Sequence, residues 1–315
     1  MRAIVVHQPG DSSVLKMEER PIPKATKDWS VMKIHAFGVH RYEVLTREGG
    51  SPSVHFPRVI GVEAVGEIYQ PSETSKLTAG QKVVTMNGGL GREYDGSYEE
   101  YALVPDKYLY PVDFQGDWVS LAQYPETFAT AYEGLKTLRL HQGQSLLLRG
   151  GTTIVGLAAI QLGKALGLKV TATTRQPERL PKLTEFGADD SVLDKDLKLQ
   201  TDQTYDGILE FVGTPTLTDS MAHLKPMGTC SIVGMLDKEW VINHFDPFEN
   251  LDQKYLTVDD SGNITPAEVQ EMFKLIKDHH LTIPISKTFT LDQIAAAQDY
   301  TMTERPVGVV IVSND

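Results

Sequence analysis

The chain has 315 residues, of which 41% are hydrophobic and 23% charged, so it holds enough apolar material for two domains or one large one. Its 42 acidic side chains outnumber the 30 basic ones, and the formal net charge of −12 disfavours binding to nucleic acid or to an anionic membrane surface. Cys230 is the single cysteine, which excludes an internal disulfide framework and any cysteine-rich zinc site.

The apolar runs of the chain are short. The run at residues 3–6 is too short for the core of a signal peptide, and no stretch reaches the roughly 18 apolar residues of a membrane span. Together with the lack of disulfides, this predicts a cytoplasmic protein without a membrane segment.

The first third of the chain has the pattern of short strands. In residues 59–68, small and apolar side chains alternate with Glu63 and Glu67, which predicts a half-buried strand with the two glutamates on the opposite face. Further strands are expected at residues 2–6, 31–36, 82–86 and 98–104, with glycine-rich turns between them. This pattern of short strands and turns indicates a small antiparallel barrel or sandwich.

After about residue 120 the pattern changes. Apolar runs at 145–149, 169–173, 207–212 and 229–233 alternate with helical patterns, of which the first recurs from Val155 to Leu166 at spacings of three and four. Such alternation is typical of βαβ units and a parallel sheet covered on both faces. A further helix is expected at 266–279. We expect the final strand, 307–312, to return to the first domain.

The run at 145–149 leads into a glycine-rich turn and then directly into a helix. Exposed amides at a helix N-terminus form a natural pyrophosphate site, and glycine permits close backbone approach. The predicted phosphate-binding residues are Gly151, Thr152, Thr153, Ile154, Val155 and Gly156. Thr153 stands where the usual dinucleotide fingerprint has its middle glycine. The alternative is a turn that only connects strand and helix.

The residue after the second parallel strand indicates which nucleotide binds. An Asp or Glu about 20 residues after the turn would accept a hydrogen bond from the ribose 2′-hydroxyl, but position 175, which is 19 residues after Gly156, is an arginine. Arginine pairs well with phosphate, so Thr174, Arg175 and Arg179 predict a 2′-phosphate and hence NADP(H). The alternative is that both arginines are merely solvated at a helix start.

In combination, these features resemble the medium-chain dehydrogenase/reductase superfamily, in its zinc-free quinone oxidoreductase (zeta-crystallin-like) branch. The resemblance covers nearly the whole chain and is carried by residues 38–43, 56–66, 95–101, 130–132, 149–156 and 173–175. It implies an α/β fold: a GroES-like antiparallel β-barrel domain, residues 1–119 and 282–315, and a Rossmann NADP-binding domain with a doubly wound parallel sheet, residues 120–281. It also implies a homodimer, which the strand-like residues 255–258 could support by edge pairing.

The resemblance assigns further site residues. It places Thr130 near the nicotinamide, and it places the pairs Val212-Gly213 and Val233-Gly234 in loops that contact the adenosine and nicotinamide sides of the cofactor. Zinc-dependent relatives carry Cys and His where this chain has His40 and Val62, so we expect no metal.

The predicted catalytic residues are His40, Tyr42 and Glu43. The zinc-free branch usually has Asn and Asp at positions 40 and 43, so here the chain departs from its pattern. A histidine could donate a hydrogen bond or a proton to the substrate. The alternatives are that His40 packs against the cofactor or is partly exposed, that Tyr42 is a pocket wall, and that Glu43 pairs with Arg41 or Arg47.

Without a metal to polarise a carbonyl group, the reaction that needs least help is hydride addition from NADPH to an activated acceptor. We therefore expect a reductase of quinones or other α,β-unsaturated carbonyl compounds. The alternatives are a specific enoyl-thioester or alkenal reductase, and a non-catalytic NADPH-binding sensor.

Overall fold

The computed structural model describes residues 1–236, 239–242, 245–259, 262 and 264–315, which form two compact units. Unit 1 comprises Met1–Glu126, Thr265–Gln270 and Ile283–Asp315; unit 2 comprises Thr127–Ile264 and Glu271–Thr282. Unit 1 thus extends beyond the predicted boundary at residue 119. One reason is that the amide of Glu126 donates a hydrogen bond to Glu63, a strand residue of unit 1 (2.6 Å).

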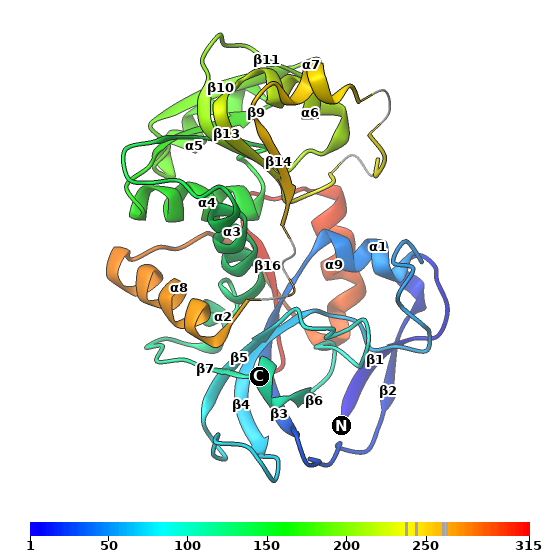
Figure 1. Cartoon of the computed structure of the whole chain (residues 1–315). Coiled ribbons are helices and arrows are strands. Elements are labelled where there is room, and N and C mark those ends of the chain that lie inside the picture. The colour runs from blue at the N-terminus through cyan, green and yellow to red at the C-terminus, as the bar shows by residue number, and fades with distance from the viewer. Residues whose placement is uncertain (237–238, 243–244, 260–261, 263) are drawn as a thin grey trace. The chain divides into compact units, whose positions relative to one another are not determined.

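Unit 1 is built on a seven-stranded sheet in the order β15-β16-β3-β4-β5-β7, with β6 pairing with β3 (Figure 1). Its strands are β3 (Trp29–Val39), β4 (Glu63–Gln70), β5 (Lys82–Met86), β6 (Tyr101–Pro105), β7 (Tyr110–Pro111), β15 (Ile285–Thr290) and β16 (Val309–Ser313). A separate hairpin is formed by β1 (Arg2–Val6) and β2 (Leu15–Glu19). The helices of this unit are α1 (Arg41–Arg47), α2 (Trp118–Leu121) and α9 (Ile294–Thr303).

The predicted strands of unit 1 are present; those at 2–6 and 82–86 have the predicted bounds, and the others have shifted ends. Pairing in the large sheet is antiparallel except between β15 and β16, and β16 pairs with β3, which confirms that the last strand returns to the first sheet. The half-buried pattern expected for residues 59–68 is wrong at Glu63. Its side chain is only 1% exposed, because it lies in a buried polar cluster.

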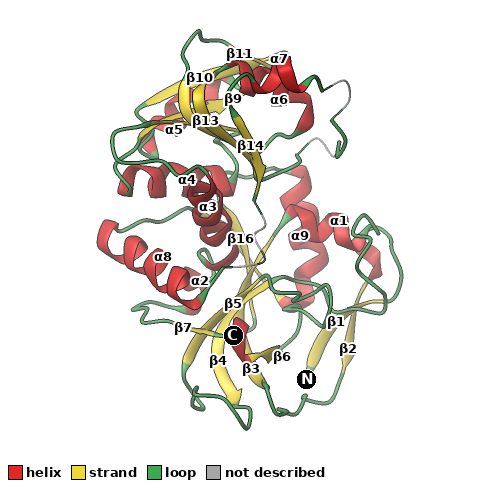
Figure 2. Cartoon of the chain, viewed as in Figure 1, coloured by secondary structure: helices red, strands yellow, loops and turns green. Residues whose placement is uncertain are grey.

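Unit 2 contains a second seven-stranded sheet, in the order β11-β10-β9-β8-β12-β13-β14 (yellow arrows in Figure 2). Its strands are β8 (Ser145–Arg149), β9 (Lys169–Thr174), β10 (Asp190–Lys195), β11 (Lys198–Leu199), β12 (Tyr205–Glu210), β13 (Leu224–Ile232) and β14 (Tyr255–Val258). Helices α4 (Ile154–Ala165), α5 (Leu180–Glu185), α6 (Thr214–Ala222) and α7 (Pro247–Leu251) belong to this unit. Helices α3 (Pro125–Thr137) and α8 (Pro266–His279) each begin in unit 1 and continue into unit 2.

The sheet of unit 2 is parallel from β10 to β14, with β11 antiparallel at one edge. The central strand β8 is almost fully buried, as its unbroken apolar run predicts. The sequence pattern missed β10 and β11. β10 lies next to the edge of the sheet and mixes exposed polar residues with the buried Val192, so it lacks the apolar run of a central strand.

A buried arginine joins several elements of this sheet. Arg149, the last residue of β8, is 0% exposed and makes a bidentate ion pair with Asp194 on β10 (2.8 and 3.1 Å). The same guanidinium donates to the hydroxyl of Ser220 on α6 (2.9 Å) and lies 2.9 Å from Asp219. A buried charge is tolerated only when it is paired in this way, and here it fixes the end of β8 against its neighbours.

Among the described residues, no helix is long and apolar enough to cross a bilayer.

Candidate functional site

The glycine-rich turn after β8 has the geometry that its sequence predicts. Gly150 has a φ of +94°, which favours glycine. A Cβ on Gly156 would lie 2.7 Å from the carbonyl oxygen of Gly151, so this helix residue must be glycine for α4 to approach the turn. Thr153 caps α4, its hydroxyl accepting from the amide of Gly156 (2.9 Å). The first two residues of α4, Ile154 and Val155, have no intrahelical acceptor for their amides, which leaves these amides available to an anion.

The turn is hydrogen-bonded to the strand that carries the predicted nucleotide-selecting residue. The amide of Gly150 donates to the hydroxyl of Thr173 (3.0 Å), and the amide of Gly151 donates to the carbonyl oxygen of Thr173 (2.9 Å). Thr174, which ends β9, is buried, and Arg175 follows it as an exposed side chain. Arg175 is therefore two residues along the chain from Thr173, the residue that contacts the turn directly.

Arg179 lies one short turn further on. It ends the 3-10 helix Pro177–Arg179 and is half-buried.

Two further predicted segments lie at the same edge of the sheet. Val212 and Gly213 follow β12, and their amides donate to the buried carboxylate of Glu210 (2.8 and 3.2 Å). The amides of Val233 and Gly234, after β13, donate to the carbonyl oxygen of Glu210 (2.9 and 3.3 Å). Sequence reasoning missed Glu210, although a glutamate ending an apolar strand run was a visible signal.

Thr130 is buried on α3 in the same unit. One turn further along this helix, a Cβ on Gly134 would lie 2.9 Å from the side chain of Val233, so α3 packs against the residue that follows β13. Residues four apart share a helix face, and Thr130 therefore faces the same way as Gly134.

The predicted catalytic residues lie in unit 1, in a buried polar cluster that we call the His40 cluster: His40, Tyr42, Glu43, Glu63 and Glu126. His40 precedes α1 and is 3% exposed, so the alternative of a partly exposed loop histidine is wrong. Its Nε2 lies 2.8 Å from Glu63 Oε1, and its Nδ1 lies 3.3 Å from Glu126 Oε2. Burial alone would lower the pKa of His40, but the charges of Glu126 and Glu63 outweigh it and raise the pKa to about 10. His40 is therefore an imidazolium with both nitrogens paired.

Glu43 is the anchor of this cluster to its surroundings. Its carboxylate accepts from the amides of His40 (2.8 Å) and Val62 (3.1 Å) and from the hydroxyl of Tyr98 (2.8 Å). Burial raises its pKa to about 7, against the lowering effect of His40.

The structure does not pair Glu43 with Arg47. That guanidinium instead donates to Gln298 on α9 (2.7 Å) and contacts Glu48 (3.2 Å). The predicted alternative of a Glu43–Arg47 ion pair is therefore wrong.

Tyr42 is half-buried, and its ring is stacked on that of His40 with centroids 5.5 Å apart. Its hydroxyl oxygen is buried and has no hydrogen-bond partner within the part of the chain that the structure describes. Burial and the neighbouring carboxylates raise the pKa of Tyr42 well above its ordinary value, so the hydroxyl stays protonated. Tyr42 is thus an unused hydrogen-bond donor in the cluster.

Both carboxylate oxygens of Glu63 are already engaged. Besides His40, Glu63 Oε1 accepts from the amide of Gly38 (3.0 Å), and Glu63 Oε2 accepts from that of Glu126 (2.6 Å). Over the described ranges, no group of three or more His, Cys, Asp or Glu side chains is arranged to hold a metal ion. The expectation of a metal-free site stays a prediction.

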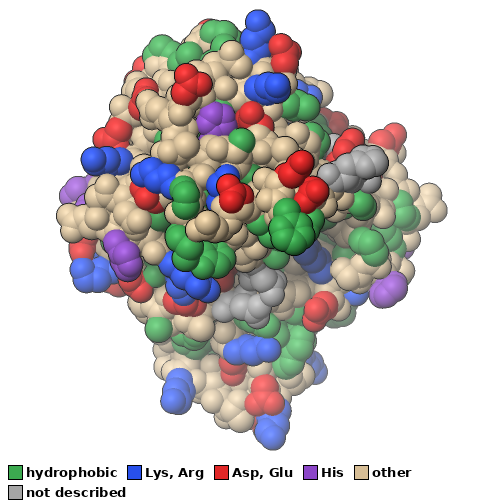
Figure 3. Space-filling view, turned by 45° about the horizontal axis from the view of Figure 1, so that its top comes forward, with side chains coloured by type: hydrophobic (Ala, Val, Ile, Leu, Met, Phe, Trp, Pro, Cys, Tyr) green, Lys and Arg blue, Asp and Glu red, His purple; other side chains and the backbone are tan. Residues whose placement is uncertain are grey.

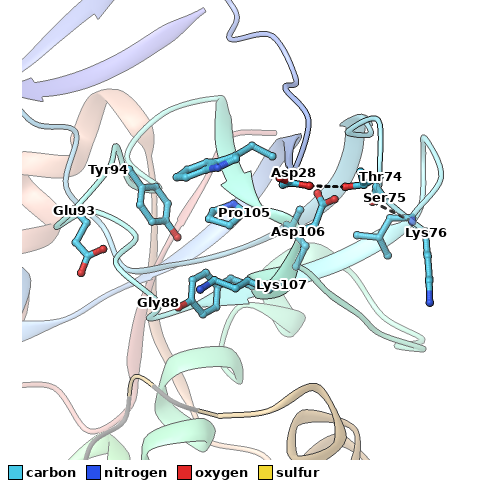
Figure 4. A pocket seen from close by; sticks show the side chains of 14 residues that line it. Asp28, Thr74, Ser75, Lys76, Gly88, Glu93, Tyr94, Pro105, Asp106 and Lys107 are labelled. Carbon is cyan, nitrogen blue, oxygen red and sulfur yellow. Dashed lines mark hydrogen bonds between the residues drawn. The ribbon is translucent and has the colours of Figure 1, made fainter.

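A cavity of about 730 Å³ lies elsewhere in unit 1 and shares no residue with the predicted sites (Figure 4). Its wall includes Trp29 and Tyr94, packed edge to face with centroids 5.0 Å apart. Asp106, which also lines it, accepts from the hydroxyls of Ser30 (2.5 Å) and Ser72 (2.6 Å). Because both carboxylate oxygens are thereby bound, we assign this residue to the support of the fold.

The paired His40 predicts a measurable titration. We expect NMR of the imidazole nitrogens to show a pKa of about 10, and Glu126→Gln to lower it because one of the three attracting charges, those of Glu126, Glu63 and Glu43, is lost. Glu304→Gln, which removes an exposed carboxylate from the same unit, serves as the control and should leave it unchanged. An ordinary pKa in the wild-type protein would contradict the paired geometry.

The same pKa values set the sign of the pH dependence of stability. A pKa raised above the ordinary 6.5 means that His40 contributes stability fully below pH 6.5 and loses it as the pH rises through about 10. Glu43, raised from 4.5 to about 7, likewise contributes less as the pH rises through that interval. Urea unfolding of the wild type should therefore lose stability between pH 6.5 and 10, and Glu126→Gln should show a shallower loss.

Comparison with known proteins gives matches in both units. The family model described as "Alcohol dehydrogenase GroES-like domain" matches residues 26–114, and "Zinc-binding dehydrogenase" matches residues 155–278. A quinone oxidoreductase from Pongo abelii is 30% identical, over 74% of this chain and 73% of its own length. An acryloyl-coenzyme A reductase from Sulfurisphaera tokodaii is 25% identical, over 99% of each chain.

Solved structures share the fold. A mycobacterial protein complexed with NADPH has a TM-score of 0.85 at 22% identity, covering 99% of this chain and 100% of that one. The predicted combination of a GroES-like domain and a Rossmann-like parallel sheet is confirmed. The chain is an oxidoreductase that belongs to the medium-chain dehydrogenase/reductase superfamily, in its quinone oxidoreductase-like branch.

Proposed function

We propose that this oxidoreductase uses NADPH to reduce quinones or other α,β-unsaturated carbonyl compounds without a metal ion. The observation that carries the proposal is the pairing of both His40 nitrogens with carboxylates (2.8 and 3.3 Å). This pairing leaves the His40 cluster with a free hydrogen-bond donor, Tyr42, but with no free imidazole nitrogen for a metal. An acceptor that is already activated by conjugation suits such a site.

The residues of unit 2 fit NADPH. The amides that open α4 can receive the pyrophosphate. Gly151 lets the turn pack closely on β9, since a Cβ there would lie 2.8 Å from the side chain of Ala172. Arg175, exposed after β9, is placed to pair with the 2′-phosphate. The loops at Val212-Gly213 and Val233-Gly234 are fixed through Glu210 and would line the rest of the site. When bound, NADPH supplies the hydride.

In unit 1, Tyr42 is the proposed donor to the acceptor's carbonyl oxygen, which gains negative charge during reduction. Its raised pKa keeps the hydroxyl protonated for this purpose. His40 supports the ring of Tyr42 from one side and supplies a fixed positive charge. The role proposed for His40 is therefore to position Tyr42, because donation by its own N–H groups would require an ion pair to break. Glu43 holds His40 through its backbone amide.

A specific enoyl-thioester reductase is the second candidate. It is favoured by the similarity to acryloyl-coenzyme A reductases, one of which spans 99% of both chains, whereas the match to the quinone oxidoreductase from Pongo abelii spans 74% of this chain. The chemistry proposed for Tyr42 is the same in both cases, since each acceptor places negative charge on a conjugated carbonyl oxygen.

The cofactor preference can be tested at Arg175. Arg175→Asp should weaken NADPH binding by at least about tenfold while changing NADH binding far less, because only NADPH carries the 2′-phosphate. Arg139→Asp, the same change at another exposed position of unit 2, is the matched control. Fluorescence titration gives both dissociation constants, and an unchanged NADPH affinity would overturn the assignment of Arg175.

The reaction class is tested by NADPH oxidation in chelator-treated buffer with benzoquinones, naphthoquinones, enones and enoyl thioesters. We expect turnover that the chelator does not reduce, and a lower kcat in Tyr42→Phe than in the wild type. Faster turnover with enoyl thioesters than with quinones would select the second candidate. NADPH binding without turnover of any acceptor would refute both and favour a non-catalytic NADPH sensor.

We also propose a homodimer formed through β14. Among the described strands, β14 pairs with β13 alone, so its outer edge has backbone groups that no described strand pairs, and Tyr255 and Val258 on it are exposed. Phe248 on the neighbouring α7 is 92% exposed, which is unusual for an apolar surface with no partner.

Light scattering tests this dimer. The wild type should have twice the chain mass of 34.9 kDa, and Phe248→Asp combined with Val258→Asp should return it to one chain. Leu166→Asp, an exposed apolar position elsewhere in unit 2, is the control. A wild-type mass of one chain would refute the dimer.

The remaining partner is proposed to be the small-molecule acceptor, with no nucleic acid and no membrane. On the face shown in Figure 3, Lys and Arg side chains are interspersed with Asp and Glu, and a nucleic-acid surface would need a continuous basic patch. A reducing cytoplasm is the proposed location, supported by the single cysteine, Cys230, which is buried in β13.

A further inference from the structure

Arg92, which forms no ion pair with a described residue, lies beside the ring of Tyr42 in the His40 cluster. The guanidinium carbon of Arg92 is 5.5 Å from the centre of the Tyr42 ring. Arg92 is exposed, and the structure gives it no ion pair with any described residue. Its position was not singled out by any sequence motif, because one arginine in a glycine-rich loop has no pattern.

The backbone holds Arg92 in this position. The loop of residues 87–97 is fastened at both ends to the segment before β4: the amide of Asn87 donates to Val62 (2.8 Å), and that of Gly96 donates to Val59 (2.7 Å). Within the loop, the amide of Arg92 donates to the carbonyl oxygen of Gly89 (3.0 Å). The cation is therefore presented by a fixed turn, with only its side chain free to move.

The loop can come this close only because of its glycines. A Cβ on Gly91 would lie 2.3 Å from the carbonyl oxygen of Gly61, and a Cβ on Gly96 would lie 2.2 Å from the same atom. The backbone on both sides of Arg92 is thus packed directly on Gly61, in the segment that leads into β4.

The charge around Tyr42 makes this arginine important. Glu63 and Glu126 against the imidazolium of His40 give the His40 cluster a formal charge of −2 + 1 = −1, and Glu43, whose pKa is about 7, adds a partial negative charge at neutral pH. The negative charge of this cluster would repel an anionic ligand that approached Tyr42 unless a cation lay beside the Tyr42 ring. Arg92 is the cation that faces the Tyr42 ring.

We infer that Arg92 recognises an anionic group, a carboxylate or a phosphate, carried by the unsaturated carbonyl acceptor whose oxygen Tyr42 receives. This inference rests on the proposed function and narrows it to acceptors with negative charge. The planar guanidinium can bind either group with two parallel hydrogen bonds, and it is available because no side chain of the described protein neutralises it.

The experiment uses two pairs of acceptors that differ in charge. Crotonyl-coenzyme A is compared with crotonyl-pantetheine, which lacks the phosphates, and trans-4-oxo-2-pentenoate is compared with the neutral 3-penten-2-one. Steady-state NADPH oxidation gives kcat and KM for the wild type, Arg92→Gln and Arg92→Lys. Arg305→Gln, which removes an exposed arginine elsewhere in unit 1, is the control.

Arg92→Gln should raise KM at least about tenfold for the anionic member of one pair and leave KM for its neutral partner within about twofold. The pair that responds identifies the group as phosphate or carboxylate. Arg92→Lys should restore part of the loss, because it keeps the charge but not the planar fork. Equal changes for both members of each pair, or no change in either, would overturn the inference.

Calorimetric binding separates this inference from the proposed function. Titration of crotonyl-coenzyme A and crotonyl-pantetheine, and of the 4-oxo-2-pentenoate pair, into the protein loaded with NADP⁺ measures binding without turnover, because the oxidised cofactor has no hydride to transfer. If the wild type fails to oxidise NADPH, the proposed function fails. Tighter binding of an anionic member to the wild type than to Arg92→Gln would still support the role of Arg92, and the same affinity for both proteins would refute it.

Discussion

The buried imidazolium of His40 is the interaction on which the candidate chemistry of unit 1 depends. A charge at 3% exposure is stable only because Glu63 and Glu126 lie at 2.8 and 3.3 Å from its two nitrogens. These carboxylates come from β4 and from the start of α3, and the amide of Glu126 is itself bound to Glu63. The ion pairs thereby hold the start of α1 between a strand and a helix. Because Tyr42 lies in the first turn of α1, they also fix its position.

Unit 2 also contains a buried cation, the guanidinium of Arg149. Arg149 ends β8 directly before the glycine-rich turn, and its pairing with Asp194 joins this strand end to β10. Ser220 receives a hydrogen bond from Arg149 and donates one to Glu210, whose other oxygen binds the amides after β12. Polar networks that are fully satisfied make a structure specific and rigid, and this one fixes the loops where a dinucleotide would bind.

Much of the fold could be predicted because the two domains have different sequence periods. Continuous apolar runs marked β8, β9, β12 and β13, and the spacing of three and four residues marked α4. β10 was missed because a strand near a sheet edge does not need an unbroken apolar run. The burial of Glu63 was predicted wrongly. Alternation indicates which face of the strand a side chain occupies, whereas the burial of that side chain depends on partners from distant segments.

The candidate site was predictable to the extent that its chemistry is local. The turn at 150–156 and Arg175 are close in sequence to the strands that position them, and the structure joins them through Thr173. The partners of His40 were not predictable in the same way. Glu126 lies 86 residues along the chain from His40, and Arg92 lies 50 residues from Tyr42, so only the folded chain brings each pair together.

The glycines that pack the 87–97 loop onto Gly61 fix the backbone of this loop but not the side chain of Arg92. Gly91 and Gly96 pack so closely on Gly61, in the segment before β4, that neither position accepts a larger residue. The side chain at position 92 is exposed, lies over the Tyr42 ring and is free of that restraint. A substitution at position 92 would therefore change the charge beside the Tyr42 ring and leave the path of the main chain unaltered.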